Sequence, residues 1–395
     1  THADTMPNLV FGNYFKGNPE VSGIAPGRIE VIGNHTDYNG GLVLGAAINR
    51  YTRVDVSRRA DDWLYLHSEQ ESAGAQIHRH AIQKQADEQS WANYILGTIA
   101  ELNEAGYPLE SGLNIAVSST IPTGAGLSSS AALEVATLEA CAELHKWNIS
   151  NEEKVDITQR AENEFVGLPC GMLDQGTIVH ATKNKLVRID CHRKRFTTVE
   201  LPVALDFWVF DTKVKHKLLD SLYTQRAREC AYVYQQLKEV EPSMECLAQA
   251  EPQLLIDHQE QLSAEHFARA MHVLEENERV TSVQNSLACS DITEVGRLLT
   301  ASHHSSRRLF QNSCPELDYL VERLTIIPGV FGARLIGGGF GGSALAMTDS
   351  TFGNNRSYEK LATRFTEHFG HRPDVWHFKL ADGAHAYWHE TDGKP

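Results

Sequence analysis

The sequence contains no apolar run long enough to span a bilayer and no stretch that gathers Lys and Arg together with aromatic residues. A membrane-spanning helix needs about 20 mostly apolar residues, and a nucleic-acid surface needs clustered positive charge. Basic residues are also outnumbered, because 36 Lys and Arg stand against 51 Asp and Glu and give a net charge of −15. We therefore expect neither nucleic acid nor a membrane as a partner.

Closely spaced cysteine pairs are missing as well. The seven cysteines are an odd number, lie far apart and form no C-x-x-C motif. This pattern indicates neither a zinc site nor the disulfide framework of a small secreted domain. The N-terminal stretch up to Phe15 also lacks the charged and then apolar pattern of a signal peptide. These observations lead us to expect a reducing, cytoplasmic location.

The nucleotide-binding motif G-x-x-x-x-G-K-[ST] is also absent, which argues against a P-loop NTPase. The chain has instead the small-residue segment Pro122–Ala132, PTGAGLSSSAA, between a predicted strand at 112–121 and a predicted helix that runs through Leu144. Small residues let backbone amides approach phosphate oxygens, and a helix start adds unpaired N–H groups. The segment predicts a phosphate site, with a plain glycine turn and serine cap as the alternative. Because the chain is acidic, ATP is expected to bind with a divalent cation.

The 395 residues suffice for two domains, and the patterns along them mix strands and helices. Ile29 and Val31 alternate with polar neighbours and predict a strand. Asn39-Gly40 predicts a tight type I′ turn, because both residue types accept the left-handed conformations that this turn needs. A second strand is expected from Leu42.

Helical patterns dominate the later part of the chain. A stretch at 152–166 ends at Gly167, and residues 214–325 read as mostly helical. The run Gly337–Gly342 contains G-x-G-x-x-G, which is typical of a dinucleotide site only when a helix follows. Ser343–Met347 reads as a strand instead, so a dinucleotide site is not expected and a glycine hairpin remains the alternative.

Several of these segments together resemble the galactokinase family, within the superfamily of small-molecule kinases that includes homoserine kinase, mevalonate kinase and phosphomevalonate kinase. Pro122–Ala132 resembles the phosphate loop of the superfamily, and Gly337–Gly342 resembles its C-terminal glycine motif. Gly27–Gly41 resembles the sugar-binding signature of galactokinases, Pro169–Gln175 the segment with their catalytic aspartate, and Val214–Cys230 a further family segment.

The resemblance implies an α+β fold of two lobes with the active site between them. We place the N-terminal lobe at residues 1–190 and the C-terminal lobe at residues 191–395. The implied activity is transfer of the γ-phosphate of ATP, with Mg²⁺, to the anomeric hydroxyl of galactose, which gives sugar 1-phosphate and ADP. A monomer is the default expectation.

The resemblance also assigns roles to single residues. Asp174 is expected to be the catalytic aspartate with Arg28 beside it, and Ser130 and Glu162 are expected to hold Mg²⁺. Asp37 is expected to accept hydrogen bonds from the C3 and C4 hydroxyls, and His35 to reach towards C6. The full set expected to bind the sugar is Asn34, His35, Asp37, Gly171 and Tyr223. The set expected to bind ATP is Trp91, Tyr94, Gly124, Ala125, Gly126, Leu127, Ser128, Ser129, Ser130 and Lys215.

One position departs from the family pattern. Galactokinases usually have a glutamate that contacts the C6 hydroxyl where this chain has Asn34. Replacing a pure acceptor by an amide removes repulsion against an acidic C6 group, so galacturonate, or another altered galactose such as N-acetylgalactosamine, is an alternative to galactose. A non-catalytic sugar sensor is a further alternative, but such proteins lack part of the Ser-Ala segment, which is complete here at Ser128–Ala132.

Overall fold

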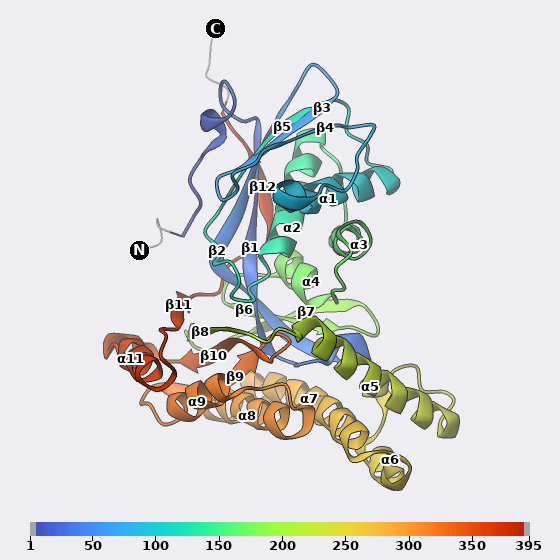
Figure 1. Ribbon diagram of the computed structural model, residues 1–395, viewed down its shortest axis with the longest axis vertical. Coiled ribbons are helices and arrows are strands. Elements are labelled where there is room, and N and C mark those ends of the chain that lie inside the picture. Colours follow the sequence, from blue (N-terminus) through green and yellow to red (C-terminus); the bar gives the residue numbers. More distant parts are fainter. Residues whose placement is uncertain (1–4, 391–395) are drawn as a thin grey trace.

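Two long antiparallel strands, β1 and β2, form the centre of the structure and run from the upper part of Figure 1 into its lower part. The computed structural model describes residues 5–390. All residues of β1 are buried, so Glu30, which the alternation placed on a polar face, is enclosed as well. The first sheet has the order β12-β1-β2-β5-β3-β4, with β6 and β7 attached beside β2. Its strands are β1 (Val21–Ile32), β2 (Leu42–Arg58), β3 (Trp63–Ser68), β4 (Ala75–His78), β5 (Leu113–Ser119), β6 (Lys185–Asp190), β7 (Arg195–Glu200) and β12 (His385–Trp388).

Helices cover one side of this sheet in Figure 1, and α2 lies directly against β1 and β2. The approach is close at Gly23 of β1, where an added Cβ would lie 2.1 Å from the carbonyl oxygen of Ala136, so only glycine fits. The helical segments of this part are η2 (Phe11–Asn13), η3 (Asp37–Asn39), η4 (Asp87–Ala92), α1 (Asn93–Glu104), α2 (Ser129–His145), α3 (Asn151–Arg160), the π-helical η5 (Ala161–Val166) and α4 (Leu173–His180).

A second sheet of four strands lies in the lower part of Figure 1, with the order β11-β8-β10-β9. Phe210, Leu335 and Phe365 belong to a core shared by this sheet and the helices packed on it. The strands are β8 (Asp206–Lys215), β9 (Val330–Ile336), β10 (Gly341–Thr348) and β11 (Asp374–Phe378). The helical segments are α5 (Leu219–Val240), η6 (Leu247–Gln249), α6 (Pro252–Asp257), η7 (Gln259–Gln261), α7 (Ala264–Ala288), α8 (Ile292–Ser305), the π-helical η8 (Ser306–Phe310), α9 (Pro315–Leu324), α10 (Ser350–Asn354) and α11 (Ser357–Phe369).

Most elements predicted from the sequence are confirmed. β5 leads through the glycine loop into α2, and the helical stretch that was expected to end at Gly167 comprises α3 and η5, with Gly167 at φ 88° closing it. The strand expected after Gly337–Gly342 is β10, so the glycine run is not followed by a helix. No helix in the described part of the chain has the length and apolar character that a membrane crossing requires.

The type I′ turn expected at Asn39-Gly40 is wrong. Asn39 belongs to η3, and the left-handed positions of the connection are Gly33, His35 and Gly40. The side-chain amide of Asn39 donates to the carbonyl oxygen of His35 at 2.8 Å, which favours a wider loop than a two-residue turn. The loop between β1 and β2 therefore folds on itself, and its side chains can line a site.

The division into lobes at residues 1–190 and 191–395 stays a prediction. β7 and β12 follow residue 190 in the chain, yet both belong to the first sheet. β12 pairs with β1 from Val21 opposite Trp388 to Ile24 opposite His385. The chain thus leaves the first sheet after β7 and returns to it at its last described strand.

Candidate functional site

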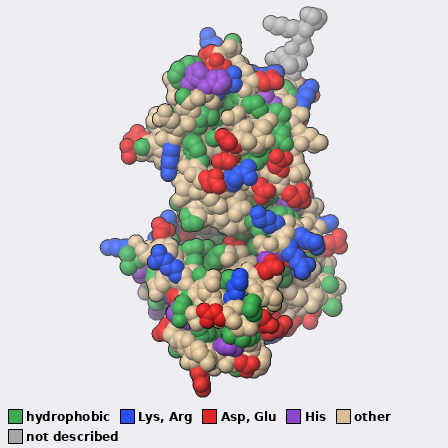
Figure 2. Space-filling view, turned by 90° about the vertical axis from the view of Figure 1, so that its right-hand side faces the viewer, with side chains coloured by type: hydrophobic (Ala, Val, Ile, Leu, Met, Phe, Trp, Pro, Cys, Tyr) green, Lys and Arg blue, Asp and Glu red, His purple; other side chains and the backbone are tan. Residues whose placement is uncertain are grey.

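A cavity of about 200 Å³ lies where β1, the loop after it, α4, α5 and the turn between β9 and β10 meet. Figure 2 shows the molecular surface hollowed between its upper and lower parts. The lining residues come from segments far apart in the sequence: Arg28, Glu30, Gly33, His35, Asp37, Pro169, Cys170, Gly171, Leu173, Asp174, Tyr223, Gly337 and Gly338. Six of the seven residues in the predicted sugar and catalytic sets, all except Asn34, therefore share one cavity.

Arg28 connects the carboxylate of the cavity with the glycine loop. Its Nε donates to Oδ1 of Asp174 at 2.7 Å, and its Nη1 donates to the carbonyl oxygen of Gly126 at 2.7 Å. The backbone amide of Arg28 also donates to the carbonyl oxygen of Leu127 at 3.0 Å. A guanidinium has a permanent charge and a rigid fork of donors, so this arrangement fixes Asp174 relative to the loop.

The backbone of β1 is irregular on both sides of Arg28 and Glu30. The pairing register with β2 shifts between Pro26 and Arg28 and again between Glu30 and Ile32. Such irregularities change the direction in which side chains point, and they are common next to active sites. They explain how a fully buried strand directs two charged side chains into the cavity.

The glycine loop before α2 is built on left-handed residues. Gly124 and Gly126 have φ values of 77° and 75°, and Ser128 has a φ of 61° at the start of the helix. Alternation of such residues with ordinary ones directs backbone N–H groups to one side, and the positive end of a helix dipole follows. The hydroxyl of Ser343, on β10, donates to the carbonyl oxygen of Ala125 at 2.9 Å and thereby stabilises this loop. The loop has the geometry of an anion site.

The side chains of the predicted ATP-binding residues differ in how deeply they are buried. Ala125 and Leu127 are buried in the core with their side chains, so only their backbone can face a phosphate. Trp91 is also buried in the core, and its indole N–H donates to the carbonyl oxygen of Ala73 at 3.0 Å. Lys215 is exposed at the end of β8. Their roles in nucleotide binding stay predictions.

Four polar side chains gather beside the start of α2. The hydroxyl of Ser130 donates to Oε1 of Glu162 at 2.8 Å, and the amide of Gln175 donates to Oε2 of Glu162 at 3.0 Å. The same amide donates to Oε1 of Glu134 at 3.1 Å. Burial, together with the nearby charge of Glu162, holds the pKa of Glu134 well above its usual range. The pKa of Tyr94 is raised by burial and by the two glutamates, so Tyr94 lies near this group.

The Ser130 and Glu162 pair suits Mg²⁺. Among residues 5–390 there is no cluster of three or more His, Cys, Asp or Glu residues that could hold a metal ion by itself. Mg²⁺ usually takes one or two protein oxygens and completes its octahedron with water and nucleotide oxygens. A hydroxyl in contact with a carboxylate at the edge of an anion site fits this requirement.

Asp37 is a half-buried carboxylate that lies close to Gly171. A Cβ added at Gly171 would lie 2.4 Å from Oδ2 of Asp37. Burial raises the pKa of Asp37 to about 6, and the charges of Glu30 and Asp174 act in the same direction against the opposing effect of the Tyr38 amide. Asp37 is therefore an acceptor whose charge depends on pH in the mildly acidic range.

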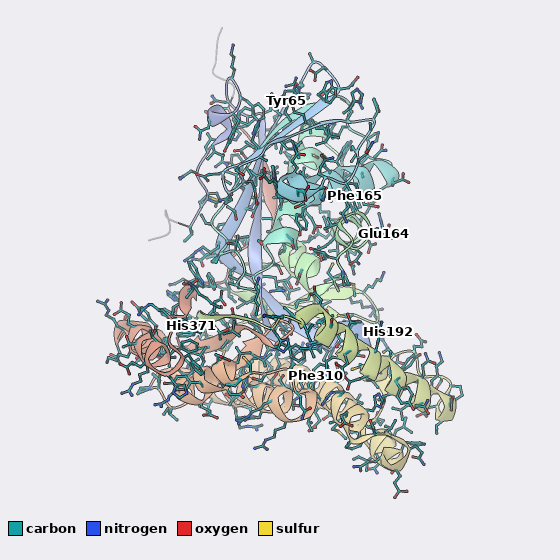
Figure 3. All side chains as sticks on the ribbon, viewed as in Figure 1. Tyr65, Glu164, Phe165, His192, Phe310 and His371 are labelled. Carbon is teal, nitrogen blue, oxygen red and sulfur yellow. The ribbon has the colours of Figure 1, made fainter. Side chains whose placement is uncertain are left out.

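His35 is held as a neutral ring on the cavity wall. Its Nε2 lies 3.1 Å from the carbonyl oxygen of Gly338, which can only accept, so this nitrogen carries the proton. Its Nδ1 then accepts from the hydroxyl of Tyr38 at 2.6 Å. Burial lowers the pKa of His35 to about 3. The ring packs between Tyr223 and Phe310 at centroid distances of 5.2 and 4.5 Å, and Figure 3 labels Phe310 among the helices of the lower part.

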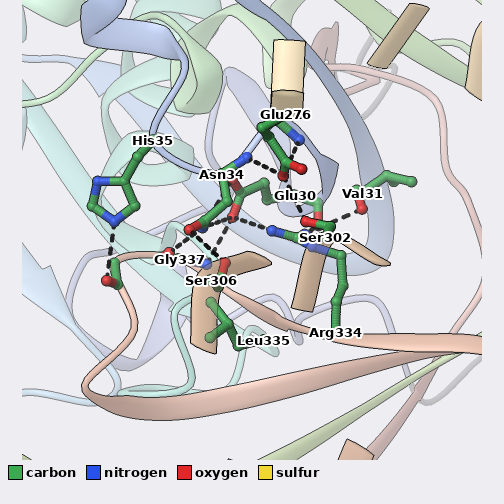
Figure 4. Close-up of polar contacts among 12 residues, drawn as sticks. Glu30, Val31, Asn34, His35, Glu276, Ser302, Ser306, Arg334, Leu335 and Gly337 are labelled. Carbon is green, nitrogen blue, oxygen red and sulfur yellow. Dashed lines mark hydrogen bonds and ion pairs between the residues drawn. The ribbon is translucent and has the colours of Figure 1, made fainter. Parts of the chain in front are cut away.

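Asn34 is not among the residues that line this cavity, and its role in sugar binding stays a prediction. Its side chain is fully buried, and its Nδ2 donates to the carbonyl oxygen of Gly337 at 2.7 Å (Figure 4). Its Oδ1 accepts from Asn312 at 3.0 Å. A hydrogen-bonding group that already has short partners on both ends offers little to a ligand. The sequence predicted Asn34 as a sugar contact, and the structure turns its side-chain amide towards Gly337 and Asn312.

The loop that carries these residues is anchored from α7. Oε2 of Glu276 accepts from the backbone amide of Asn34 at 2.8 Å and from the hydroxyl of Ser302 at 2.6 Å (Figure 4). Burial would raise the pKa of Glu276, but the charges of Arg279, His272 and Arg334 outweigh it and lower the pKa to about 2. The sugar signature is thus held in place by a permanently charged carboxylate from the lower part of the molecule.

Sequence reasoning missed Glu30, Gln175 and Glu276. Glu30 lines the cavity, Gln175 joins two glutamates, and Glu276 holds the loop. A charged residue between the apolar residues Ile29 and Val31 was a usable signal for Glu30. Gln175 follows Asp174 directly and ends the segment Pro169–Gln175, but no role was predicted for it. Nothing in the local pattern around Glu276 separates it from the other charged residues of its helix.

The segments that form this site match models of known protein families. Residues 10–58 match the galactokinase galactose-binding signature, residues 93–182 match the N-terminal domain of GHMP kinases, and residues 280–366 match the C-terminal region of GHMP kinases. These ranges contain the loop of Asp37, the glycine loop with α4, and the glycine run before β10.

Two curated relatives and two solved structures illustrate the similarity. A galactokinase of Thermotoga petrophila is 39% identical over 348 residues, which cover 88% of this chain and 94% of the relative. The galactokinase of Canis lupus familiaris is 36% identical over 87% of both chains. A structure of Lactococcus lactis galactokinase complexed with galactose superimposes with a TM-score of 0.89 at 29% identity, covering 95% of this chain and 97% of that one. Methanococcus jannaschii mevalonate kinase, at 18% identity and a TM-score of 0.66 over 93% of this chain and all of its own, shares the fold.

Proposed function

This chain belongs to the galactokinase family, and from that membership we propose that it transfers the γ-phosphoryl group of ATP to the anomeric hydroxyl of galactose. The products are sugar 1-phosphate and ADP. The observation that carries the proposal is the contact of Arg28 with both Asp174 and the glycine loop. It joins a candidate acceptor for a hydroxyl proton to a candidate phosphate site through one cation.

Phosphoryl transfer mainly requires that the protein position the reactants and stabilise charge. Asp174 accepts or orients the proton of the attacking hydroxyl, and Arg28 keeps the carboxylate in place through its Nε. The guanidinium also carries positive charge towards the side on which the glycine loop lies, where the transferred group develops negative charge. The N–H groups of the loop and of the first turn of α2 bind phosphate oxygens.

Mg²⁺ is part of this proposal, held by Ser130 and Glu162 with oxygens of the nucleotide. The ion supplies charge neutralisation for the phosphates when it is bound. Gln175 keeps Glu162 in orientation by donating to its second oxygen. Because Gln175 also donates to Glu134, these residues form one connected group under the phosphate site.

Galactose fits the charges of the cavity better than an acidic sugar does. Glu30, Asp37 and Asp174 line it together with one cation, Arg28, which Asp174 already contacts. A carboxylate on the sugar would be repelled by this surplus of negative charge. Since Asn34 does not line the cavity, its difference from the usual glutamate gives galacturonate no direct advantage.

A coupled assay of ADP release with Mg-ATP tests the proposed function. Galactose, galacturonate, N-acetylgalactosamine, arabinose, glucose, homoserine and mevalonate form the panel. We expect galactose to give the highest kcat/KM. Higher values for galacturonate or N-acetylgalactosamine would establish one of the altered sugars as the substrate, and no turnover with any compound would favour the sugar sensor.

The kcat/KM for galactose is expected to fall with decreasing pH below about 6, the pKa of Asp37. The protonated form of a carboxyl group loses most of its capacity to accept hydroxyl hydrogen bonds, and kcat/KM reports ionisations of the free enzyme. Well below this pKa the decline approaches about tenfold per pH unit. The pH profile of kcat/KM at saturating Mg-ATP measures this, and a decline centred near pH 4, the ordinary value for Asp, would contradict the assignment.

Glu162→Gln is expected to raise the Mg²⁺ concentration needed for half-maximal turnover by roughly tenfold or more, because a neutral amide is a weaker ligand than a carboxylate. Glu164→Gln is the matched control, since Glu164 lies on the same π-helical segment and is exposed (Figure 3). Titration of turnover with Mg²⁺ at fixed ATP compares the two variants. Equal Mg²⁺ requirements in both would remove Glu162 from the proposed site.

Location and assembly belong to the proposal as well. The cytoplasmic location rests on the cysteines, all seven of which are free in the described part of the chain. The monomeric state is checked by light scattering coupled to size-exclusion chromatography.

A further inference from the structure

Glu30 is a charged residue near the end of β1, a strand whose residues are all buried, and the proposed reaction gives it no task. The residue is only 4% exposed, and it lines the cavity. The residue opposite it on β2 is Gly45, and the pairing register shifts immediately after it. A carboxylate in such a place is costly unless it is paired or used.

The oxygens of Glu30 are unequally occupied. Oε2 accepts from the backbone amide of Gly337 at 2.8 Å and lies 3.5 Å from Nη2 of Arg334. Among residues 5–390, Oε1 has only a long contact of 3.4 Å with Nδ2 of Asn34, and that nitrogen makes its short bond to the carbonyl oxygen of Gly337 (Figure 4). A carboxylate offers about four acceptor positions, so Oε1 keeps acceptor capacity.

Arg334 is the cation that lies beside this carboxylate. Its side chain is 1% exposed, and its Nη1 donates to the carbonyl oxygens of Glu30 and Val31 at 2.7 and 3.1 Å (Figure 4). The guanidinium is therefore fixed by the backbone of β1 beside the carboxylate, and Arg334 is not among the residues that line the cavity. A buried carboxylate with a cation beside it and acceptor capacity left on one oxygen is suited to accept a hydrogen bond from a neutral ligand.

We propose that Glu30 is a sugar-binding residue whose Oε1 accepts a hydrogen bond from a hydroxyl other than the one that is phosphorylated, and whose charge excludes acidic sugars. The inference rests on the proposed function, because it takes the sugar as the occupant of the cavity. Asp37 and Glu30 then act as two separate acceptors on one ligand. Asn34 contributes by holding Gly337, whose amide orients Glu30.

A substrate-by-variant comparison tests this assignment. The kcat/KM of the wild type, Glu30→Gln and Glu30→Asp is measured with galactose, with its 2-deoxy, 3-deoxy, 4-deoxy and 6-deoxy analogues, and with galacturonate. Glu30→Gln keeps an oxygen for the Gly337 amide, and Glu30→Asp keeps the charge beside Arg334 but withdraws the carboxylate. Thermal unfolding of each variant establishes that it is folded.

We expect Glu30→Gln to lower kcat/KM for galactose by about tenfold or more, which is typical of losing one charged acceptor. For one deoxy analogue the same substitution is expected to have almost no effect, because the hydroxyl that Glu30 binds is already missing. Glu30→Asp is expected to follow this pattern. The ratio of galacturonate to galactose turnover is expected to rise at least about tenfold in Glu30→Gln, since a like charge is removed.

Glu139→Gln is the matched control, because Glu139 is another buried glutamate with an ion pair, to Lys154 at 2.8 Å, and it does not line the cavity. We expect it to leave the preference among these sugars unchanged. If Glu30→Gln lowered kcat/KM by the same factor for galactose and for every deoxy analogue, the inference would be overturned and Glu30 would have a purely structural role.

Failure of the proposed function is recognised separately. If the wild type turns over none of these sugars, the binding of galactose to the wild type and to Glu30→Gln is measured by calorimetry. Weaker binding to Glu30→Gln, with one deoxy analogue unaffected, keeps the role of Glu30 without the reaction. Absence of galactose binding to the wild type overturns both.

Discussion

Asp174→Asn is expected to lower kcat by roughly 10²- to 10⁴-fold, the range typical of losing a general base. Asparagine has nearly the same size, and its Oδ1 can still accept from Nε of Arg28, a bond that measures 2.7 Å in the wild type. The positions of Arg28 and the glycine loop should thus be retained while the acceptor for the hydroxyl proton is lost. Single-turnover rates with Mg-ATP and galactose measure the effect.

Nucleotide binding separates this outcome from misfolding. Asp174→Asn is expected to bind a fluorescent ATP analogue with the affinity of the wild type, because the contacts of the glycine loop are unchanged. Asp257→Asn is a suitable control, since Asp257 is exposed at the end of α6. If Asp174→Asn turned over galactose at the wild-type rate, Asp174 would not be the catalytic aspartate.

Gly171→Ala is expected to raise the KM for galactose by about 100-fold, with a smaller change in kcat. The new Cβ would lie 2.4 Å from Oδ2 of Asp37, so the carboxylate has to move from the position in which it is proposed to bind two hydroxyls. Loss of two hydrogen bonds to a charged group is sufficient for an effect of about this size. Steady-state kinetics with varied galactose at saturating Mg-ATP measure it.

The selectivity of this effect makes Gly171→Ala informative. The KM for ATP is expected to stay unchanged, because the clash concerns the side chain of Asp37 and not the glycine loop. Gly12→Ala is the matched control, since a Cβ at Gly12 would have no heavy atom within 4 Å. An unchanged KM for galactose in Gly171→Ala would mean that Asp37 does not bind the sugar.

The parts of the site that the sequence predicted are a loop with a fixed local spacing and two residue pairs that the family resemblance placed together. The glycine loop between β5 and α2 was predicted together with the helix that follows it. The proximity of Ser130 to Glu162 and of Arg28 to Asp174 followed from the family resemblance, and the structure brings both pairs into direct contact. A phosphate loop is defined by its own backbone, which explains why a local pattern was sufficient there.

The parts that the sequence did not predict depend on partners from distant segments. The direction of the Asn34 side chain is set by Gly337 and Asn312, and its backbone is held by Glu276, which is 242 residues away in the chain. The error at Asn39-Gly40 has a different, local origin, because a side-chain bond within the loop favours a wider course than a two-residue turn. The motif predicted Asn34 as a sugar contact. In the structure, its side-chain amide points towards Gly337 and Asn312.

The pairing of β12 with β1 has a consequence for how the molecule assembles. Synthesis proceeds from the N-terminus, so β1 leaves the ribosome long before β12. Until β12 emerges, one edge of the strand that carries Arg28 and Glu30 has no partner and is open to pairing with another nascent chain. Contacts between such distant segments also form slowly. Completion of the first sheet, and with it the final shape of the sugar site, is therefore expected after translation has passed residue 388.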